Sequence, residues 1–400
     1  MLYAASLIGV GLGVLSSVLN TSFLDPKSYG DYRYVFNIIS LLSGLLLFGY
    51  FVSGSRLLAL SDDQSYRKRI NGAMILILIF VSFILIVLMA ITGFFFNKGS
   101  DTVKHLCFTS MLVCASPLIL NYINTTFQGE NRIKELSWAR LLPYFIYLPI
   151  GYIVYSTYGA TPERMMLLQN GAAIIVYITL IILLKPSFAN LGPIFKKLNI
   201  ENKEYGWHVY TGAVLAVSLA NVSGVTIGIF EENNTNVGFY SLALTVASPL
   251  MMLPAIVGTT HFKEFARQDR IPLMVFKRTL LISIATFVLF TLFIIPLVKF
   301  LYSEKYSQVG YYAIWMAVAM TMHGFGDMIN RFLGAHGKGR EIRNSAVCCG
   351  LTQLFGSFVF VYFWGIYGAI ATRILASGIY MAMMLVYYKK IERLVGNNPS

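Results

Sequence analysis

The chain has 400 residues, of which 56% are hydrophobic and only 12% are charged, and its mean hydropathy is +0.66. So few charged side chains cannot cover the surface of a water-soluble globule of this length, which excludes a soluble enzyme or a soluble binding domain. The net charge is +13. Because the basic residues lie mainly between apolar runs, this charge indicates membrane orientation and no nucleic-acid binding.

Apolar runs long enough to cross a bilayer recur along the whole chain. A helix needs about 20 residues, at 1.5 Å each, to cross roughly 30 Å of hydrocarbon. Backbone hydrogen bonds in lipid must be closed within each segment, so the runs predict helices and an all-α polytopic membrane protein. We expect about twelve transmembrane helices, at 2–19, 34–52, 74–96, 106–126, 138–158, 165–184, 209–230, 237–260, 280–301, 309–329, 346–364 and 366–387.

The longest polar gap divides these spans into two sets of six. It runs from Lys185 to His208 and contains two prolines and several lysines. We therefore expect an N-terminal six-helix lobe at 1–190, a cytoplasmic linker at 191–207 and a C-terminal six-helix lobe at 208–400.

The distribution of Lys and Arg predicts the orientation. Placing the N-terminus inside assigns most of the 31 basic residues to cytoplasmic loops and the tail, as the positive-inside rule requires. This predicts a multi-pass membrane protein with both termini in the cytoplasm.

A weak internal repeat relates the two halves. At an offset of 208 residues, five identical pairs align without a gap: Gly30 with Gly238, Tyr32 with Tyr240, Gly129 with Gly337, Arg132 with Arg340, and Ser137 with Ser345. Six spans in each half make the repeat parallel, with a pseudo-two-fold axis along the membrane normal. That arrangement predicts a central cleft between two bundles.

Three short segments resemble one transporter family. They are FLDPKSYGDY at 23–32, EENNTNVGFYSLA at 231–243 with Pro249 and Pro254 beyond it, and the glycine and basic turns QGENRIK at 128–134 and GAHGKGR at 334–340. With the six-plus-six layout, they resemble the O-antigen and capsule repeat-unit flippases of the multidrug, oligosaccharidyl-lipid and polysaccharide exporter superfamily.

The resemblance implies a function and a set of partners. It implies a flippase that moves a polyprenyl-diphosphate-linked oligosaccharide across the inner membrane by alternating access, without catalysis, cofactor or metal. Membrane lipids, a polysaccharide polymerase and chain-length proteins are the further partners that it implies. Many relatives carry an acidic residue in helix seven shortly after an Asn that resembles Asn221, whereas here the stretch 222–228 reads VSGVTIG, so ion coupling at that helix is not expected.

Charged residues inside spans are candidates for the substrate site, because burying a charge in lipid is costly. His323, Asp327 and Arg331 follow each other at intervals of four and share one helical face. On one interpretation, Asp327 holds Arg331 until a diphosphate competes for it; on the other, this is a helix end in cytoplasmic water. Arg56, placed just beyond the second span, is either at the inner mouth of the cleft or a topology charge.

Further candidates lie in the fifth span and at the outer side. Tyr144, Tyr147 and Tyr155 lie on one helical face together with Gly151 and Tyr158. Tyrosines on such a face either bind sugars of the substrate or pack against neighbouring helices. Of these two interpretations, packing is favoured. Arg33 and Arg373, expected at the periplasmic ends of helices two and twelve, are either interfacial anchors or an exit-side anion site. Glu231 and Glu232 are interpreted as a solvated outer turn.

Two other functions stay open. A cation-coupled exporter of small molecules would be supported by a carboxylate deep in the N-terminal lobe, which helices one to six lack on this interpretation. A membrane-embedded polymerase or ligase would place its site on a large periplasmic loop, whereas the predicted outer loops are all short.

Overall fold

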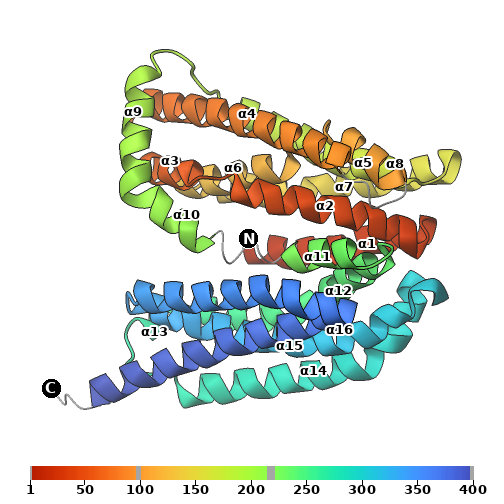
Figure 1. Cartoon of the computed structure of the whole chain (residues 1–400). Coiled ribbons are helices and arrows are strands. Elements are labelled where there is room, and N and C mark those ends of the chain that lie inside the picture. Colours follow the sequence, from red (N-terminus) through yellow and green to blue (C-terminus); the bar gives the residue numbers. More distant parts are fainter. Residues whose placement is uncertain (1, 96–100, 214–220, 397–400) are drawn as a thin grey trace. The chain divides into compact units, whose positions relative to one another are not determined.

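The computed structural model describes residues 2–95, 101–213 and 221–396 (Figure 1). Every regular element in these ranges is helical, and they contain no strand, which confirms the all-helical class. Contacts divide the chain into two compact units. Unit 1 comprises Met1–Asn221 with Asn233–Thr235, and unit 2 comprises Val222–Glu232 with Asn236–Ser400. The predicted lobe boundaries at 190 and 208 stay a prediction.

Unit 1 begins with eight described helices, two of which start at a side-chain cap. They are α1 (Leu2–Phe23), α2 (Pro26–Leu45), α3 (Tyr50–Ala59), α4 (Gln64–Phe95), α5 (Asp101–Ser110), α6 (Ser116–Gly129), α7 (Ile133–Tyr158) and α8 (Pro162–Leu183). The backbone N–H groups of Lys27 and Ser28 donate to the Asp25 carboxylate, and Pro26 occupies the first helical position, which starts α2. Thr161 caps α8 in the same way.

The second predicted span, 34–52, is broken. It falls on α2 and α3, which are bent by 59°. Gly49 precedes α3 with φ of +80°, a left-handed conformation that a glycine adopts without steric cost. A β-carbon at this position would lie 2.5 Å from the carbonyl oxygen of Gly206, so the break is also a place where two backbones meet closely.

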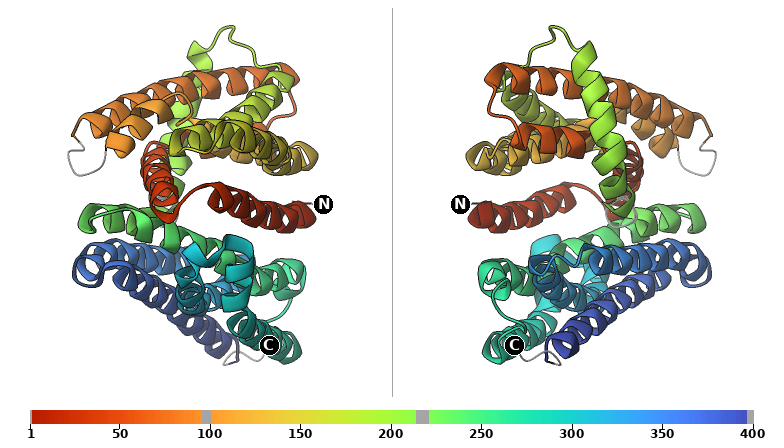
Figure 2. Two further views of the ribbon diagram at one scale, coloured as in Figure 1. Left: turned by 90° about the vertical axis from the view of Figure 1, so that its right-hand side faces the viewer. Right: turned by 90° about the vertical axis from the view of Figure 1, so that its left-hand side faces the viewer.

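Unit 1 ends in a continuous helical stretch that runs differently from the others. It consists of α9 (Gly192–Glu201), the π-helix η1 (Asn202–Gly206) and α10 (Trp207–Ala213). In Figure 1 these elements cross one end of unit 1 instead of running along α4. In the right-hand view of Figure 2, which faces that end, α9 lies in front of the other helices of the unit.

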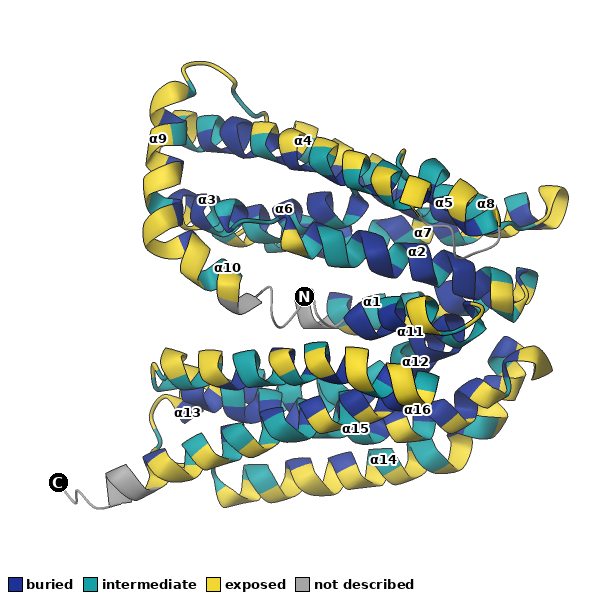
Figure 3. Ribbon diagram, in the orientation of Figure 1, coloured by how far each residue is buried: buried dark blue, intermediate teal, exposed yellow. Residues whose placement is uncertain are grey.

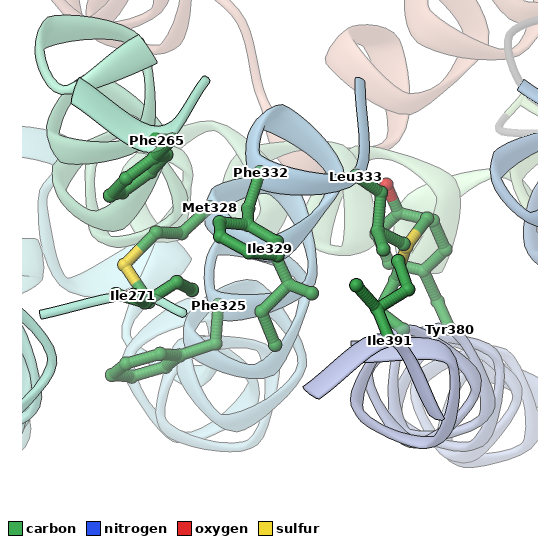
Figure 4. Packing of buried hydrophobic residues seen from close by; sticks show 10 residues of the cluster. Phe265, Ile271, Phe325, Met328, Ile329, Phe332, Leu333, Tyr380 and Ile391 are labelled. Carbon is green, nitrogen blue, oxygen red and sulfur yellow. The ribbon is translucent and has the colours of Figure 1, made fainter. Parts of the chain in front are cut away.

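The described residues of unit 2 form six labelled α-helices and one short 3₁₀ helix. They are α11 (Val222–Phe230), α12 (Thr235–Thr260), α13 (Phe262–Phe265), α14 (Leu273–Tyr302), η4 (Glu304–Tyr306), α15 (Gln308–Ala335) and α16 (Gly339–Gly396). A buried cluster joins α13, α15 and α16 (Figure 4). In it, the Phe265 and Phe332 rings meet edge to face with centroids 5.7 Å apart, and Met328 and Leu333 are fully buried.

The element α16 is two helices joined by a sharp reversal. Gly365 has φ of +52° and ψ of −132°, so the helix is interrupted there. β-carbons built at Gly356 and Gly368 would lie 2.8 Å from Thr372 and 2.0 Å from the Phe360 carbonyl oxygen, contacts that a straight helix cannot make at these separations. The chain therefore folds back on itself, at the position where the sequence predicts one span to end at 364 and the next to begin at 366.

The number of spanning helices depends on how the bent helices are divided. Among the described residues, six helices are long and apolar enough to cross a membrane, and seven if α2 and α3 form one bent span. These six include α16 as one helix, although it has two arms, and they do not include α5 and α6, each of which is short. In their described parts the predicted ranges fall mainly on helices, with breaks between α2 and α3 and between α5 and α6, while residues 214–220 of the predicted range 209–230 lie outside the described residues. The total of twelve and the layout of two six-helix lobes stay predictions.

Exposed apolar side chains line the long helices. Figure 3 shows exposed positions recurring along the length of α4 and α14. Phe80 and Phe83 on α4 are 63% and 62% exposed, and Leu292 and Phe300 on α14 are 66% and 86% exposed. Apolar area of this extent on helices of 32 and 30 residues is typical of surfaces that face lipid. The protein is therefore a multi-pass membrane protein.

Candidate functional site

Arg56 is an exposed cation held by two neighbours from the segment after α8. It lies in the last turn of α3, inside the broken span, and not beyond a helix end as predicted. Its Nη1 donates to Glu201 Oε1 at 2.5 Å, and its guanidinium lies 4.8 Å from the centre of the Tyr205 ring. The cation is thus partly satisfied before any anion binds, and an exposed ion pair of this kind exchanges at low cost.

The predicted tyrosine face of α7 is mostly interior. Tyr147 and Tyr155 are buried, with their hydroxyls 3.0 Å apart, and Tyr147 also donates to Asn20 on α1. Tyr144 is half-buried, whereas Tyr158 is 73% exposed. The hydroxyls of Tyr147 and Tyr155 are therefore already used within unit 1, which fits the packing interpretation.

The polar network around Tyr147 joins four helices. Gln169 Oε1 on α8 accepts from Tyr32 on α2 at 2.8 Å and from Asn20 on α1 at 3.2 Å. Three of these residues, Asn20, Tyr32 and Gln169, were not predicted as site residues. Their amide and hydroxyl groups satisfy each other in a low-dielectric interior, which ties these helices together.

Arg33 lies farther into the protein than predicted. It is seven residues after Pro26, or about 10 Å along α2 at 1.5 Å per residue, and not at the helix end. Its guanidinium lies 5.4 Å from the Phe36 ring centre. Its Nε is buried and has no hydrogen-bond partner among the described residues. A cation with a free donor inside the unit is a candidate anion ligand.

Asp31 is a buried carboxylate that the sequence analysis passed over. Its side chain is 3% exposed, and its Oδ1 accepts from Asn234 Nδ2 at 2.7 Å within unit 1. The statement that helices one to six lack a buried carboxylate is therefore wrong for this position in the second turn of α2. The signal was a single acidic residue between Gly30 and Tyr32, whose burial depends on a partner 203 residues away.

In unit 2, His323 and Asp327 both face Tyr380 of α16. The His323 ring stacks on Tyr380 with centroids 4.6 Å apart, and the Tyr380 hydroxyl donates to Asp327 Oδ1 at 3.0 Å. Asn330 Nδ2 donates to the same hydroxyl at 2.8 Å. Tyr380 is thus the centre of a half-buried polar cluster between α15 and α16.

Arg331 is not held by Asp327, contrary to one of the two predicted arrangements. No ion pair within 4.0 Å joins these two described residues, and Arg331 is exposed. Its aliphatic stem lies beside Gly258 of α12, where a β-carbon would be 3.1 Å from Arg331 Cγ. Arg331 still interacts electrostatically with Asp327 at longer range, but it forms no ion pair with a described carboxylate, so the guanidinium can accept an anion without first breaking one.

Arg373 belongs with the Tyr380 cluster. It lies eight residues beyond the break at Gly365, inside the second arm of α16 and not at a helix end as predicted. It interacts electrostatically with both His323 and Asp327. Its Nε is buried without a hydrogen-bond partner in the part of the chain that the structure describes.

Glu231 caps the reversal in α16, so the interpretation of both glutamates as a solvated turn is wrong for this residue. Glu231 Oε1 accepts from the backbone N–H of Ile366 at 3.0 Å, and Oε2 accepts from Asn236 at 2.6 Å. Burial raises the pKa of Glu231 above its ordinary value of 4.5, against the opposing effect of these two hydrogen bonds. Glu232 is exposed as expected.

Comparison with known proteins identifies the family. The model of the family described as "Polysaccharide biosynthesis protein" matches residues 1–262. No curated protein is significantly similar in sequence. The fold resembles that of the lipid II flippase MurJ in an inward closed conformation, with a TM-score of 0.78 and 14% identity over 97% of this chain and 87% of that one.

Multidrug transporters share the fold as well. An inward-facing MATE family transporter of the MOP superfamily gives a TM-score of 0.67 at 14% identity, with 97% and 96% of the two chains covered. An outward-facing MATE family transporter of the same superfamily gives 0.64 at 13% identity, over 100% and 96%. The chain thus belongs to the polysaccharide biosynthesis protein family, and its fold is that of the MOP exporter superfamily, as the sequence motifs predicted.

Proposed function

We propose that this protein is a flippase that carries a polyprenyl-diphosphate-linked oligosaccharide repeat unit across the bacterial inner membrane, for O-antigen or capsular polysaccharide synthesis. The observation that carries the proposal is the family match over residues 1–262. The likeness to a protein named as a lipid II flippase, which covers 97% of this chain, supports a lipid-linked substrate.

The charges of the candidate residues suit such a substrate. A diphosphate carries about two negative charges, and a guanidinium binds its oxygens with two parallel hydrogen bonds. Arg56 and Arg331 are exposed on their units, and Arg33 and Arg373 each keep a buried Nε without a partner among the described residues. Four arginines that are not locked into buried ion pairs supply the cationic groups that a diphosphate needs.

The proposed cycle is alternating access of two six-helix lobes, with both termini in the cytoplasm. The headgroup passes between the lobes while the polyprenyl tail stays in the bilayer. This requires no bond to be broken, so no catalytic residue is assigned. A polysaccharide polymerase and chain-length proteins are the proposed partners that consume the exported repeat unit.

The decisive experiment measures whether the purified protein flips its lipid-linked substrate across the bilayer of proteoliposomes. Vesicles contain a fluorescent polyprenyl-diphosphate oligosaccharide, and a membrane-impermeant reductant quenches only the outer leaflet. The proposal requires the quenched fraction to rise above that of empty vesicles when the protein is present. The same quenched fraction in empty vesicles and in vesicles that contain the folded protein would overturn it.

In cells, a deletion strain should accumulate the lipid-linked intermediate on the cytoplasmic face.

A second candidate function is cation-coupled export of small molecules. Asp31 is the observation that favours it, because a buried carboxylate in unit 1 is a group that a proton or a cation can bind. Drug-stimulated proton or sodium flux in the same vesicles, absent in Asp31→Asn, would support export. Flipping without such flux would favour the lipid-linked substrate.

A further inference from the structure

The helical stretch from α9 to α10 presents two opposite faces of different character. It contacts α3 through α9, η1 and α10, and it also contacts α4 through α9. Residues at intervals of four are buried on its inner side: Ile194, Leu198, Asn202 and Gly206. The opposite side carries Lys196, Ile200, Lys203 and Trp207, which are all exposed. We call these last four residues the outer stripe.

The inner side is fully used by contacts within unit 1. Ser53 Oγ donates to Asn202 Oδ1, and Asn202 Nδ2 donates to the Phe48 carbonyl oxygen, both at 3.1 Å. Gly206 fits against Gly49 and Ser53 so closely that a β-carbon would lie 2.0 Å from Ser53 Oγ. These contacts fix the rotation of the stretch about its own axis, and they thereby fix which residues point away from the protein.

The outer stripe combines lysines with large apolar side chains. Ile200 is 50% exposed and Trp207 is 46% exposed, between Lys196 and Lys203. A face of this composition suits neither bulk water nor hydrocarbon, but it suits the headgroup layer, where tryptophan is enriched and lysine meets lipid phosphates. Glu204 is the acidic residue exposed nearby, and Lys197 is engaged 4.9 Å from the Tyr66 ring.

The position of the stretch points to the same layer. It crosses the end of unit 1 at α3 and at α4, whose apolar length reaches across a bilayer (Figure 1). A helix at the end of a spanning helix lies at the depth of the headgroups. We propose that the outer stripe binds anionic phospholipid headgroups, with Lys196 and Lys203 contacting the phosphates and Ile200 and Trp207 inserted beside them.

The depth of Trp207 tests the insertion. In a variant with Trp138, Trp315 and Trp364 replaced by Phe, Trp207 is the remaining tryptophan. In nanodiscs, lipids brominated near the headgroup should quench its fluorescence, and aqueous iodide should quench it poorly. Strong quenching by iodide with none by the brominated lipids would place the stripe in water and overturn the proposal.

The lysines test the lipid specificity. Lys196→Gln with Lys203→Gln should weaken phosphatidylglycerol binding, measured by native mass spectrometry against phosphatidylcholine, by about fivefold for each lysine. Lys389→Gln with Lys390→Gln is the matched control, because these exposed lysines on α16 remove the same charge elsewhere. Equal losses in both double variants, or no loss in the first, would overturn the proposal. A stripe that instead captured a soluble protein would bind it without bilayer and leave the lipid preference unchanged.

Discussion

Arg56 on α3 is paired with Glu201 on α9 through an Nη1–Oε1 hydrogen bond of 2.5 Å. If Arg56 binds a substrate diphosphate, the phosphate oxygens must displace this carboxylate. Removing the competitor should therefore strengthen binding. An exposed pair contributes about 0.2–1 kcal/mol, so we expect Glu201→Gln to lower the Kd for a short-chain polyprenyl diphosphate by about 1.4- to 5-fold.

Isothermal titration calorimetry on the detergent-solubilised protein measures this change. Glu204→Gln is the matched control, since it removes the same charge from the neighbouring π-helix, where Glu204 is exposed and forms no ion pair with a described residue. An unchanged or higher Kd for Glu201→Gln would show that Arg56 does not bind the diphosphate.

The rate of flipping should depend on which cationic side chain stands at positions 56 and 331. Lysine keeps the charge but loses the planar fork that binds two oxygens, so we expect Arg331→Lys to flip substrate roughly tenfold more slowly or worse. Arg331→Glu should be inactive, and Arg56 should follow the same order. If Arg→Ala variants at both positions, present at normal protein levels, support wild-type polysaccharide assembly, these residues are not part of the substrate site.

The Tyr380 hydroxyl should stabilise unit 2. Tyr380→Phe removes the hydroxyl that joins the half-buried Asp327 carboxylate and Asn330 amide, and a hydrogen bond contributes about 0.5–1.5 kcal/mol to stability. We expect a lower Tm in a thermal unfolding assay. Tyr362→Phe, at a residue that is 65% exposed, is the control and should leave the Tm unchanged. A Tm for Tyr380→Phe equal to that of the control would contradict the assigned cluster.

Glu231 should make stability depend on pH. Its pKa is raised on folding, so the folded protein binds this proton more tightly than the unfolded chain. The stability that results is complete below the unfolded pKa of about 4.5 and is lost as the pH rises through the raised folded pKa. Glu231→Gln cannot titrate, and its Tm should therefore vary less over this window. Parallel Tm profiles of the two proteins would refute the assignment.

Cysteine accessibility tests the predicted orientation. In a background without the four native cysteines, single cysteines at 62–65, 131, 200 and 395 should resist an impermeant thiol reagent in intact cells. Cysteines at 161, 232 and 305 should react. In the outer turn after α11, position 232 is chosen because Glu232 is exposed whereas the nearby Asn234 is buried. A cysteine at position 100, in the loop expected outside after the third span, should react as well; this position and the side chain at 395 lie outside the described residues. If the first group is labelled, the protein has the opposite orientation in the membrane.

The helices could be predicted because their signal is local. Apolar runs of about 20 residues locate a spanning helix whatever packs around it, which is why the division at Gly365 was placed between 364 and 366. The break at Gly49 was missed for a physical reason. Its cause is a close approach to Gly206, a contact between positions 157 residues apart that no local pattern reveals.

The candidate site shows the same limit. The spacing of His323 and Asp327 predicted a shared face, but their common partner Tyr380 comes from another helix. Glu231 was interpreted as part of a solvated turn, and Asp31 was not considered. Their burial depends on Asn234 and on the backbone of Ile366, which only the fold brings near.

The reversal at Gly365 has a consequence for biogenesis. The arms of α16 are joined by one residue with non-helical torsion angles, which leaves no loop to cross the membrane ahead of the second arm. The two arms should therefore enter the bilayer together as a helical hairpin while the ribosome completes the chain. A ribosome stalled before Ile366 would hold the first arm without the segment that it packs against, so the last two predicted spans form a single unit of membrane insertion.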